Sequence, residues 1–208
     1  MGIDFVILWV DGNDPEWQSE KSKYDSSVND DSNSANRYRD WGLLPYWFRG
    51  VEKFTPWVNK IHFVTWGHIP EFLNTENPKL NIVNHKDFIP NEYLPTFSSH
   101  AIEMNIHRIP GLSDKFVYFN DDMFPVGHCV QTDFFRDGKG VIGMYRHLLS
   151  PNMYKKICRI SDQVGRRLAG KGSALTFMRP QHICSPMLKS VCTQVYDSNA
   201  PEIRQTAE

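Results

Sequence analysis

The sequence has no long apolar segment and no recognisable export signal. A helix that crosses a bilayer needs about 20 consecutive apolar residues, and no such run occurs. The first residues lead straight into a strand-like run that carries Asp4, without the basic and apolar parts of a signal peptide. We therefore expect a cytoplasmic protein, associated at most peripherally with the inner face of the membrane.

The chain also lacks an excess of charge and a paired cysteine motif. Lys and Arg total 23 against 24 Asp and Glu, which gives a net charge of -1. Because binding to a phosphate backbone requires a basic surface, nucleic acid is not an expected partner. The cysteines show neither CxxC nor zinc-finger spacing, so we expect reduced structural thiols. They are Cys129, Cys158, Cys184 and Cys192.

Apolar runs and helical periodicity are present instead. The 208 residues suffice for one α/β domain. Alternation of strands and helices predicts a doubly wound, mostly parallel sheet of GT-A or Rossmann-like type. The expected strands are 3–10, 60–66, 79–83 and 115–120. The expected helices are 40–54, a short one between the second and third strands, and 98–109, capped by Ser98 or Ser99 with Glu103 in a capping role.

The segments outside this alternation are polar or cationic. Residues 18–36 offer almost nothing to bury and are expected to form a mobile loop that could serve as a lid. We divide the chain into an α/β core at 1–145 and a small, mainly helical C-terminal part at 146–208. That part includes a cationic helix near 150–170 and a helix at 186–196.

The fourth expected strand ends in two adjacent carboxylates, within "KFVYFNDDMFP" at 115–125. Asp121 and Asp122 repel each other and require a counter-charge. Nucleotide-sugar enzymes of the GT-A type hold a divalent cation at such a tip, and carboxylate oxygens suit Mg²⁺ or Mn²⁺. A helix N-cap or a water-screened turn is the alternative explanation.

Further polar residues are expected at the same edge of the sheet, because ligands bind beyond the carboxyl ends of parallel strands. Asp11 and Asp14 would accept hydrogen bonds from ribose, base or sugar hydroxyls, and Gly12 would let the backbone approach the ligand closely. An ordinary turn is the alternative. The remaining substrate-binding candidates are Arg39, Arg49, Thr65, Ser99 and Asn120. Guanidinium groups match phosphate oxygens, although each arginine could equally lie on a solvated face. His182, in "RPQHICSP", is either a general base or a surface side chain.

Several stretches together resemble one family. "IDFVILWVDGNDPEW" is similar to the first region of the Stealth sugar-phosphate transferases. "RYRDWGLLPYWFRGVEKFTPWVNKIHFVTWGHIPEFL" and "LPTFSSHAIEMNIHRIPGLSDKFVYFNDDMF" are similar to their second region. The family includes bacterial capsular and exopolysaccharide phosphotransferases and the α/β precursor of N-acetylglucosamine-1-phosphotransferase.

The resemblance implies transfer of a hexose-1-phosphate. An acceptor hydroxyl on an oligosaccharide or lipid-linked glycan attacks the β-phosphorus of a nucleotide sugar such as a UDP-hexose, and UMP leaves. Residues 1–145 would bind the donor. Asp121 and Asp122 match the family's acidic catalytic or metal pair, and His182 matches a catalytic histidine of the third region.

One departure affects the expected activity. In relatives the third region continues into an arginine beyond the position of Thr206, whereas this chain ends at "EIRQTAE" and Arg204 lies too early to replace it. We therefore expect an incomplete third region. Two alternatives to the transferase function remain. One is a GT-A-like glycosyltransferase that releases UDP, and the other is an inactive fragment that still binds the donor.

Overall fold

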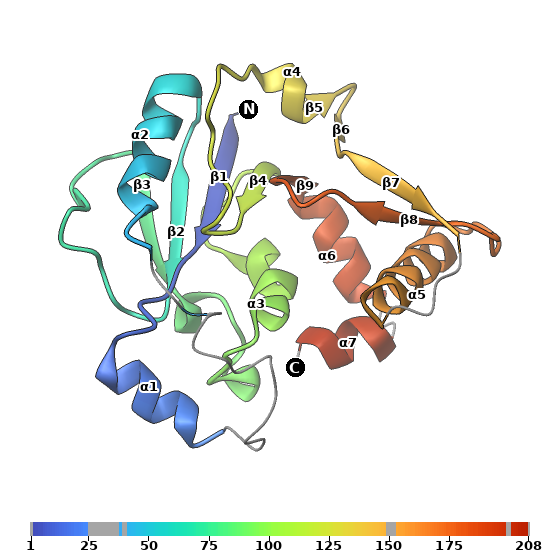
Figure 1. Cartoon of the computed structure of the whole chain (residues 1–208), viewed down its shortest axis with the longest axis horizontal. Coiled ribbons are helices and arrows are strands. Elements are labelled where there is room, and N and C mark those ends of the chain that lie inside the picture. The colour runs from blue at the N-terminus through green and yellow to red at the C-terminus, as the bar shows by residue number, and fades with distance from the viewer. Residues whose placement is uncertain (1, 25–37, 39–40, 149–152, 199–200, 208) are drawn as a thin grey trace.

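A five-stranded sheet forms the centre of the computed structural model, which describes residues 2–24, 38, 41–148, 153–198 and 201–207. The strand order is β3-β2-β1-β4-β9 (Figure 1). Neighbours among β1 to β4 pair in parallel, and β9 pairs antiparallel with β4. The strands are β1 (Ile3–Leu8), β2 (Ile61–Thr65), β3 (Leu80–Asn84), β4 (Lys115–Phe119) and β9 (Ser185–Leu188). The predicted mostly parallel α/β fold is confirmed.

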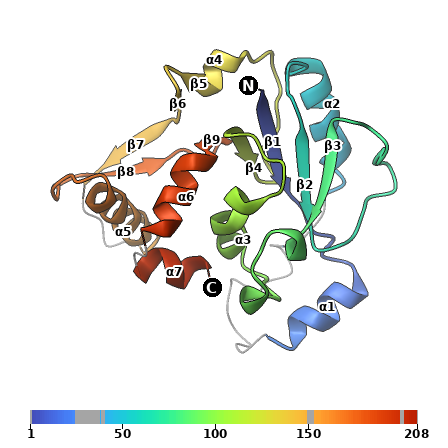
Figure 2. The ribbon, with the colours of Figure 1, turned by 180° about the vertical axis from the view of Figure 1, so that it is seen from behind.

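Both faces of this sheet are covered, which explains why its strands are almost continuously apolar. Phe5 and Ile7 pack on one face with Trp47, whereas Val6 packs on the other with Ile102. Helix α2 (Leu44–Phe54) supplies the first cover and helix α3 (Ser99–Asn105) the second. The two helices lie on opposite sides of the sheet (Figure 2).

Local sequence explains these helices. In α2 the buried residues recur every three to four positions, and Pro45 falls in the first turn, where its missing N–H costs little. Ser98 is the N-cap of α3 and accepts from the backbone N–H of Ala101. Asp14 is the N-cap of α1 (Pro15–Ser22), which lies beyond the end of β1 (Figure 1).

The chain after β4 adds strands as well as helices. A short helix α4 (Gln131–Phe134) leads into the hairpin of β5 (Phe135–Arg136) and β6 (Lys139–Gly140). A second pair joins β7 (Met144–His147) to β8 (Phe177–Pro180). The helices are α5 (Met153–Leu168), α6 (Lys189–Asp197) and α7 (Pro201–Ala207). Because β9 belongs to the main sheet, the two predicted parts of the chain share one sheet.

Four expectations about local structure were wrong. Residues 66–79 form turns rather than a short helix, and α1 occupies part of the expected loop at 18–36. The helix expected at 186–196 begins at Lys189, because residues 185–188 pair with β4 as a strand. Glu103 does not cap α3; it lies half-buried beside Tyr118. Among the described residues, no helix is long and apolar enough to cross a membrane.

A buried polar cluster ties the strands together. Asp4 is 0% exposed and accepts from Asn59 Nδ2 at 2.7 Å, from the backbone N–H of Ser113 at 2.7 Å and from His62 Nε2 at 3.2 Å. Asn81 Nδ2 contacts the other ring nitrogen of His62 at 2.9 Å. Side chains of β1, β2 and β3 therefore share one network around a single carboxylate.

Replacing Asp4 with alanine should lower the free energy of unfolding by about 3–5 kcal/mol, because His62 and the Ser113 N–H would lose their buried acceptor. Urea denaturation near neutral pH measures the loss. Glu76→Ala removes an exposed carboxylate and is the matched control, with an expected change within about 0.5 kcal/mol. Equal stabilities of the two variants would contradict the role assigned to Asp4.

The same cluster should make the protein sensitive to acid. Burial by itself raises the pKa of Asp4, but hydrogen bonds from His62, Ser113 and Asn59 outweigh it and lower the pKa from 3.8 to about 2. Because the folded-state pKa lies below the unfolded one, the stabilisation is complete above about pH 4 and is lost as the pH falls towards 2. The loss amounts to about 2 kcal/mol and should be absent from urea titrations of Asp4→Asn.

Candidate active site

The carboxyl ends of β1, β2 and β4 meet at one edge of the sheet. The chain proceeds from β1 outward to β2 and β3 and then returns to β4 on the other side of β1. Such a reversal of strand order leaves a crevice between the two strands, which is where α/β proteins of this type bind ligands. The predicted residues Asp11 and Asn120 follow the two strands that flank this reversal.

The acidic pair lies in a turn directly after β4. The backbone N–H of Met123 donates to Asn120 O at 3.2 Å, so Asp121 and Asp122 occupy the middle of the turn. Asp122 is exposed, and its Oδ2 lies 2.9 Å from His182 Nε2. Their side chains are 63% and 68% exposed, respectively, which leaves both accessible to a substrate. The structure thus joins two predicted residues that are 60 positions apart.

The edge strand β9 explains this contact. It runs antiparallel to β4 with Ser185 opposite Tyr118. The beginning of β9 therefore lies at the carboxyl end of β4, and His182, three residues before Ser185, reaches Asp122.

Two residues that the sequence reasoning did not assign to the site, Tyr118 and Glu103, support the side chain of Asn120. The Tyr118 hydroxyl donates to Asn120 Oδ1, and Glu103 of α3 also hydrogen-bonds with Tyr118. Burial raises the pKa of Glu103 and, together with Glu103, raises that of Tyr118. Tyr118 therefore stays protonated and donates at neutral pH. The position of Glu103 between the apolar residues Ile102 and Met104 was the signal in the sequence.

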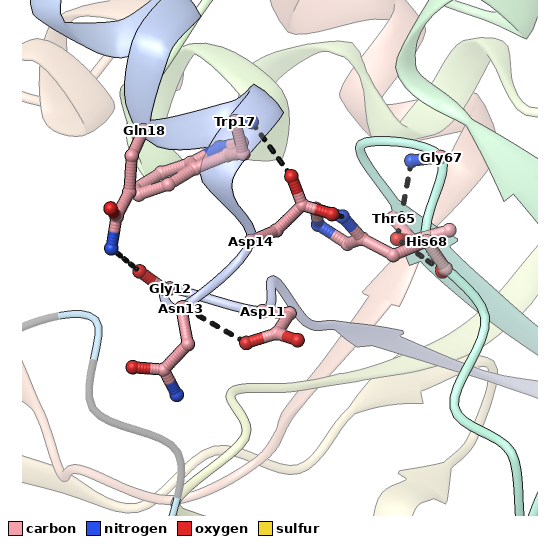
Figure 3. A network of polar contacts seen from close by, with 9 residues as sticks. All are labelled: Asp11, Gly12, Asn13, Asp14, Trp17, Gln18, Thr65, Gly67 and His68. Carbon is pink, nitrogen blue, oxygen red and sulfur yellow. Dashed lines mark hydrogen bonds and ion pairs between the residues drawn. The ribbon is translucent and has the colours of Figure 1, made fainter.

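A second network holds the segment after β1 (Figure 3). Asp14 Oδ1 accepts from the backbone N–H of Trp17 at 2.8 Å, and Asp14 Oδ2 lies 3.2 Å from His68 Nδ1. The Trp17 N–H and then His68 lower the pKa of Asp14. Thr65 Oγ1 donates to His68 O at 2.9 Å and accepts from the Gly67 N–H at 3.3 Å. Asp14 and Thr65 thus position the turn that carries His68.

Asp11 and Gly12 make local contacts of a different kind. Asp11 Oδ1 accepts from the backbone N–H of Asn13 at 2.9 Å. Gly12 lies so close to the carbonyl oxygen of Tyr38 that a Cβ atom would clash with it. The close approach expected at this glycine is therefore made by the chain itself.

The remaining candidates separate into two groups. Ser99, Asn120 and Asp121 line one cavity of about 160 Å³. Arg49 instead lies exposed on α2, with its guanidinium 5.4 Å from the centre of the Tyr46 ring, and lines other hollows. Arg39 lies outside the described residues.

The site offers few ligands for a metal ion. In the described part of the chain, no three His, Cys, Asp or Glu side chains cluster in a way that could hold one. Mg²⁺ is commonly held by one or two carboxylates together with substrate phosphates and water. Asp121 and Asp122 fit that mode of binding, in which a diphosphate completes the coordination.

A Rossmann-like sheet with an exposed acid and histidine beyond its strand ends defines an α/β protein with a candidate acid–base site. The Stealth conserved region 2 model matches residues 37–142, and the region 1 model matches residues 1–28. The chain belongs to the Stealth family. The matched regions contain every candidate site residue except His182.

Several curated relatives come from streptococci. The receptor polysaccharide phosphotransferase WefC of Streptococcus oralis is 53% identical over 153 residues, covering 72% of this chain and 45% of that protein. The capsular polysaccharide phosphotransferase CpsJ of Streptococcus thermophilus is 49% identical over 159 residues, covering 74% and 67%. WcwK of Streptococcus pneumoniae, with the same description as CpsJ, is 52% identical over 153 residues, covering 72% and 45%. The chain thus spans less than half the length of two of these relatives.

Gly12→Ala should destabilise the protein by about 1–3 kcal/mol, because the new methyl group would overlap the Tyr38 carbonyl oxygen. Thermal or urea unfolding measures the change. Gly127→Ala is the matched control, since a Cβ atom there meets nothing within 4 Å. If both variants unfold alike, the close packing of residues 12 and 38 has no energetic importance.

Proposed function

We propose that this chain transfers a hexose-1-phosphate from a nucleotide sugar, preferably UDP-linked, to a glycan hydroxyl in the synthesis of a capsular or extracellular polysaccharide. The contact between His182 and Asp122, beside Asp121, is the observation that carries the proposal. Relatives about half identical to the chain are described as polysaccharide phosphotransferases, which supports this class of reaction.

The geometry assigns distinct roles to the two nitrogens of His182. An ionised carboxylate only accepts hydrogen bonds, so the Nε2 atom that faces Asp122 carries the proton. In the neutral ring, Nδ1 then keeps its lone pair and is the atom that can act as a base. Asp122 fixes this tautomer and stabilises the ring when Nδ1 becomes protonated.

The reaction then proceeds as a displacement at phosphorus. Nδ1 of His182 takes the proton of the acceptor hydroxyl as its oxygen forms a bond to the β-phosphorus. The bond between that phosphorus and the bridging oxygen breaks, and its electron pair leaves with UMP. Positioning and charge neutralisation supply most of the catalysis in such transfers.

Charge on the diphosphate requires neutralisation at the acidic turn. Asp121 and the second oxygen of Asp122 would hold Mg²⁺ or Mn²⁺, which offsets charge on the phosphates when bound. Asn120, fixed by Tyr118, lies beside the acidic pair and is placed to donate through its amide nitrogen. These residues bind and orient the donor, whereas His182 acts on the acceptor.

The acceptor class follows from the same reaction. An oligosaccharide or a lipid-linked glycan would present the attacking hydroxyl. Peripheral association with the inner face of the membrane would bring the site to a lipid-linked acceptor. The cationic helix α5, with Lys155, Lys156 and Arg167, is the candidate for that contact.

UMP release from UDP-sugars, with Mn²⁺ and an oligosaccharide acceptor, is the direct test. His182→Asn should lower kcat by about 10²–10⁴-fold, because it removes the base. Asp122→Asn should lower it on the order of 10³-fold through loss of charge at the metal and of the histidine tautomer. His128→Asn changes an exposed histidine with no assigned role and should retain activity.

Three other outcomes would contradict part or all of this proposal. Release of UDP in place of UMP would mean cleavage of the bond between sugar C1 and oxygen, as in a glycosyltransferase. Tight donor binding without either product would mean a donor-binding chain without turnover. Full UMP release by both site variants would overturn the roles of Asp122 and His182.

A further inference from the structure

The cavity at the reversal of strand order has two chemically different ends. It is lined by the last residues of β1 and those that follow it, by Tyr118, Asn120 and Asp121 around the end of β4, and by residues of the segment before α3. Asp121 belongs to the acidic turn. The lining also includes His85, directly after β3, which lies three strands away from β4 in the sheet. The cavity therefore extends from the proposed phosphate site after β4 towards an uncharged region near the end of β3.

Aromatic rings form much of the wall. The Trp17 ring lies 4.9 Å from that of Tyr38 and 5.9 Å from that of Phe97, measured between centroids. All three residues line the cavity, with Trp9 and Leu8 from the end of β1. Flat, apolar walls of this kind hold planar rings by stacking and burial.

His85 provides polarity in this largely apolar setting, and one of its ring nitrogens is unsatisfied within the described part of the chain. Its side chain is only 9% exposed, and its Nδ1 has no hydrogen-bond partner among the described residues. Buried polar atoms in proteins are almost always hydrogen-bonded, so each exception requires an explanation. A bound ligand with donor and acceptor atoms on its edge would supply the missing bond.

The charge state of His85 limits which ligand fits. Burial, with a smaller effect of His68, lowers the pKa of His85 to about 4. The ring is therefore neutral at physiological pH and presents one donor and one acceptor. Such a ring suits the edge of an uncharged heterocycle and offers no counter-charge to a phosphate.

Size supplies the remaining constraint. The cavity measures about 160 Å³, whereas pockets that enclose whole drug-sized ligands usually exceed about 300 Å³. It therefore has room for a single small ring, with the rest of the ligand extending outward past Asp121.

We infer that this cavity binds the nucleobase of the donor, with the one-ring base of a pyrimidine nucleotide against Trp17 and Phe97 and its edge hydrogen-bonded to His85. This inference rests on the proposed function, since it places one end of the proposed donor. Its consequence is a direction of binding. The base lies beside His85, which follows β3, and the diphosphate extends past Asn120 towards Asp122 and His182.

Calorimetric titration of the intact chain with UMP, CMP, AMP and GMP tests the inference. UMP or CMP should bind at least tenfold more tightly than the purine nucleotides. His85→Phe, which keeps a ring of similar size, should weaken UMP binding by about tenfold. His85→Asn, which keeps hydrogen-bonding capacity, should recover part of that loss. His128→Phe is the matched control and should bind UMP as the unchanged protein does.

Spectroscopy of the unaltered protein gives an independent measurement. Adding UMP to protein labelled at histidine should shift the imidazole resonances of His85, and those of the exposed His128 should stay in place. Equal affinity for purines and pyrimidines, unchanged UMP binding by His85→Phe, or unshifted His85 resonances would each overturn the inference.

These results separate the inference from the proposed function. If His85→Phe releases UMP from a UDP-sugar with unchanged KM, the base lies elsewhere while phosphotransfer stands. If UMP binds as expected but no UDP-sugar yields UMP, the base pocket stands and phosphotransfer fails.

Discussion

The antiparallel pairing of β9 with β4 is the constraint on which the candidate active site depends. Without β9, the acidic turn after β4 would face solvent with no base beside it. With Ser185 held opposite Tyr118, the loop before β9 must pass the carboxyl end of β4, and His182 reaches Asp122. Backbone hydrogen bonds between strands thus determine a distance between two side chains that are both more than half exposed. Surface ion pairs alone are too weak to position groups in this way.

The sheet behind the site supplies the rigidity that the exposed pair lacks. Apolar side chains cover both faces, and the Asp4 network links β1 to β2 and to the segment before β4. Functional groups on loops are held most precisely where a rigid scaffold ends directly beneath them. Asn120 follows β4 without an intervening loop and is anchored by Tyr118, which Glu103 contacts in turn. Stability and positioning therefore come from the same strands.

Aromatic side chains and carboxylate groups lie in neighbouring parts of one crevice. The proposed base cavity is lined largely by apolar and aromatic side chains, whereas Asp122 of the acidic turn is exposed to solvent. A nucleotide sugar has the matching division, since its base is uncharged and its diphosphate is charged. Neutral His85 suits the base, and a cation held by Asp121 and Asp122 would attract the diphosphate, so the two ends would favour one direction of binding. The reacting phosphorus would lie on the exposed side, where a large glycan acceptor has access.

The sequence by itself determined the local features of this protein. Continuous apolar runs predicted β1 and β4, three-to-four periodicity predicted α2, and the acidic pair after β4 indicated the candidate reactive edge. It misassigned residues 186–188 as helix, because a short strand at the edge of a sheet is stabilised by its partner rather than by its own pattern. Only the tertiary structure decided which residues meet: His182 with Asp122, Glu103 with Tyr118, and His85 with an apolar cavity. These contacts join distant positions through packing, and no local pattern encodes them.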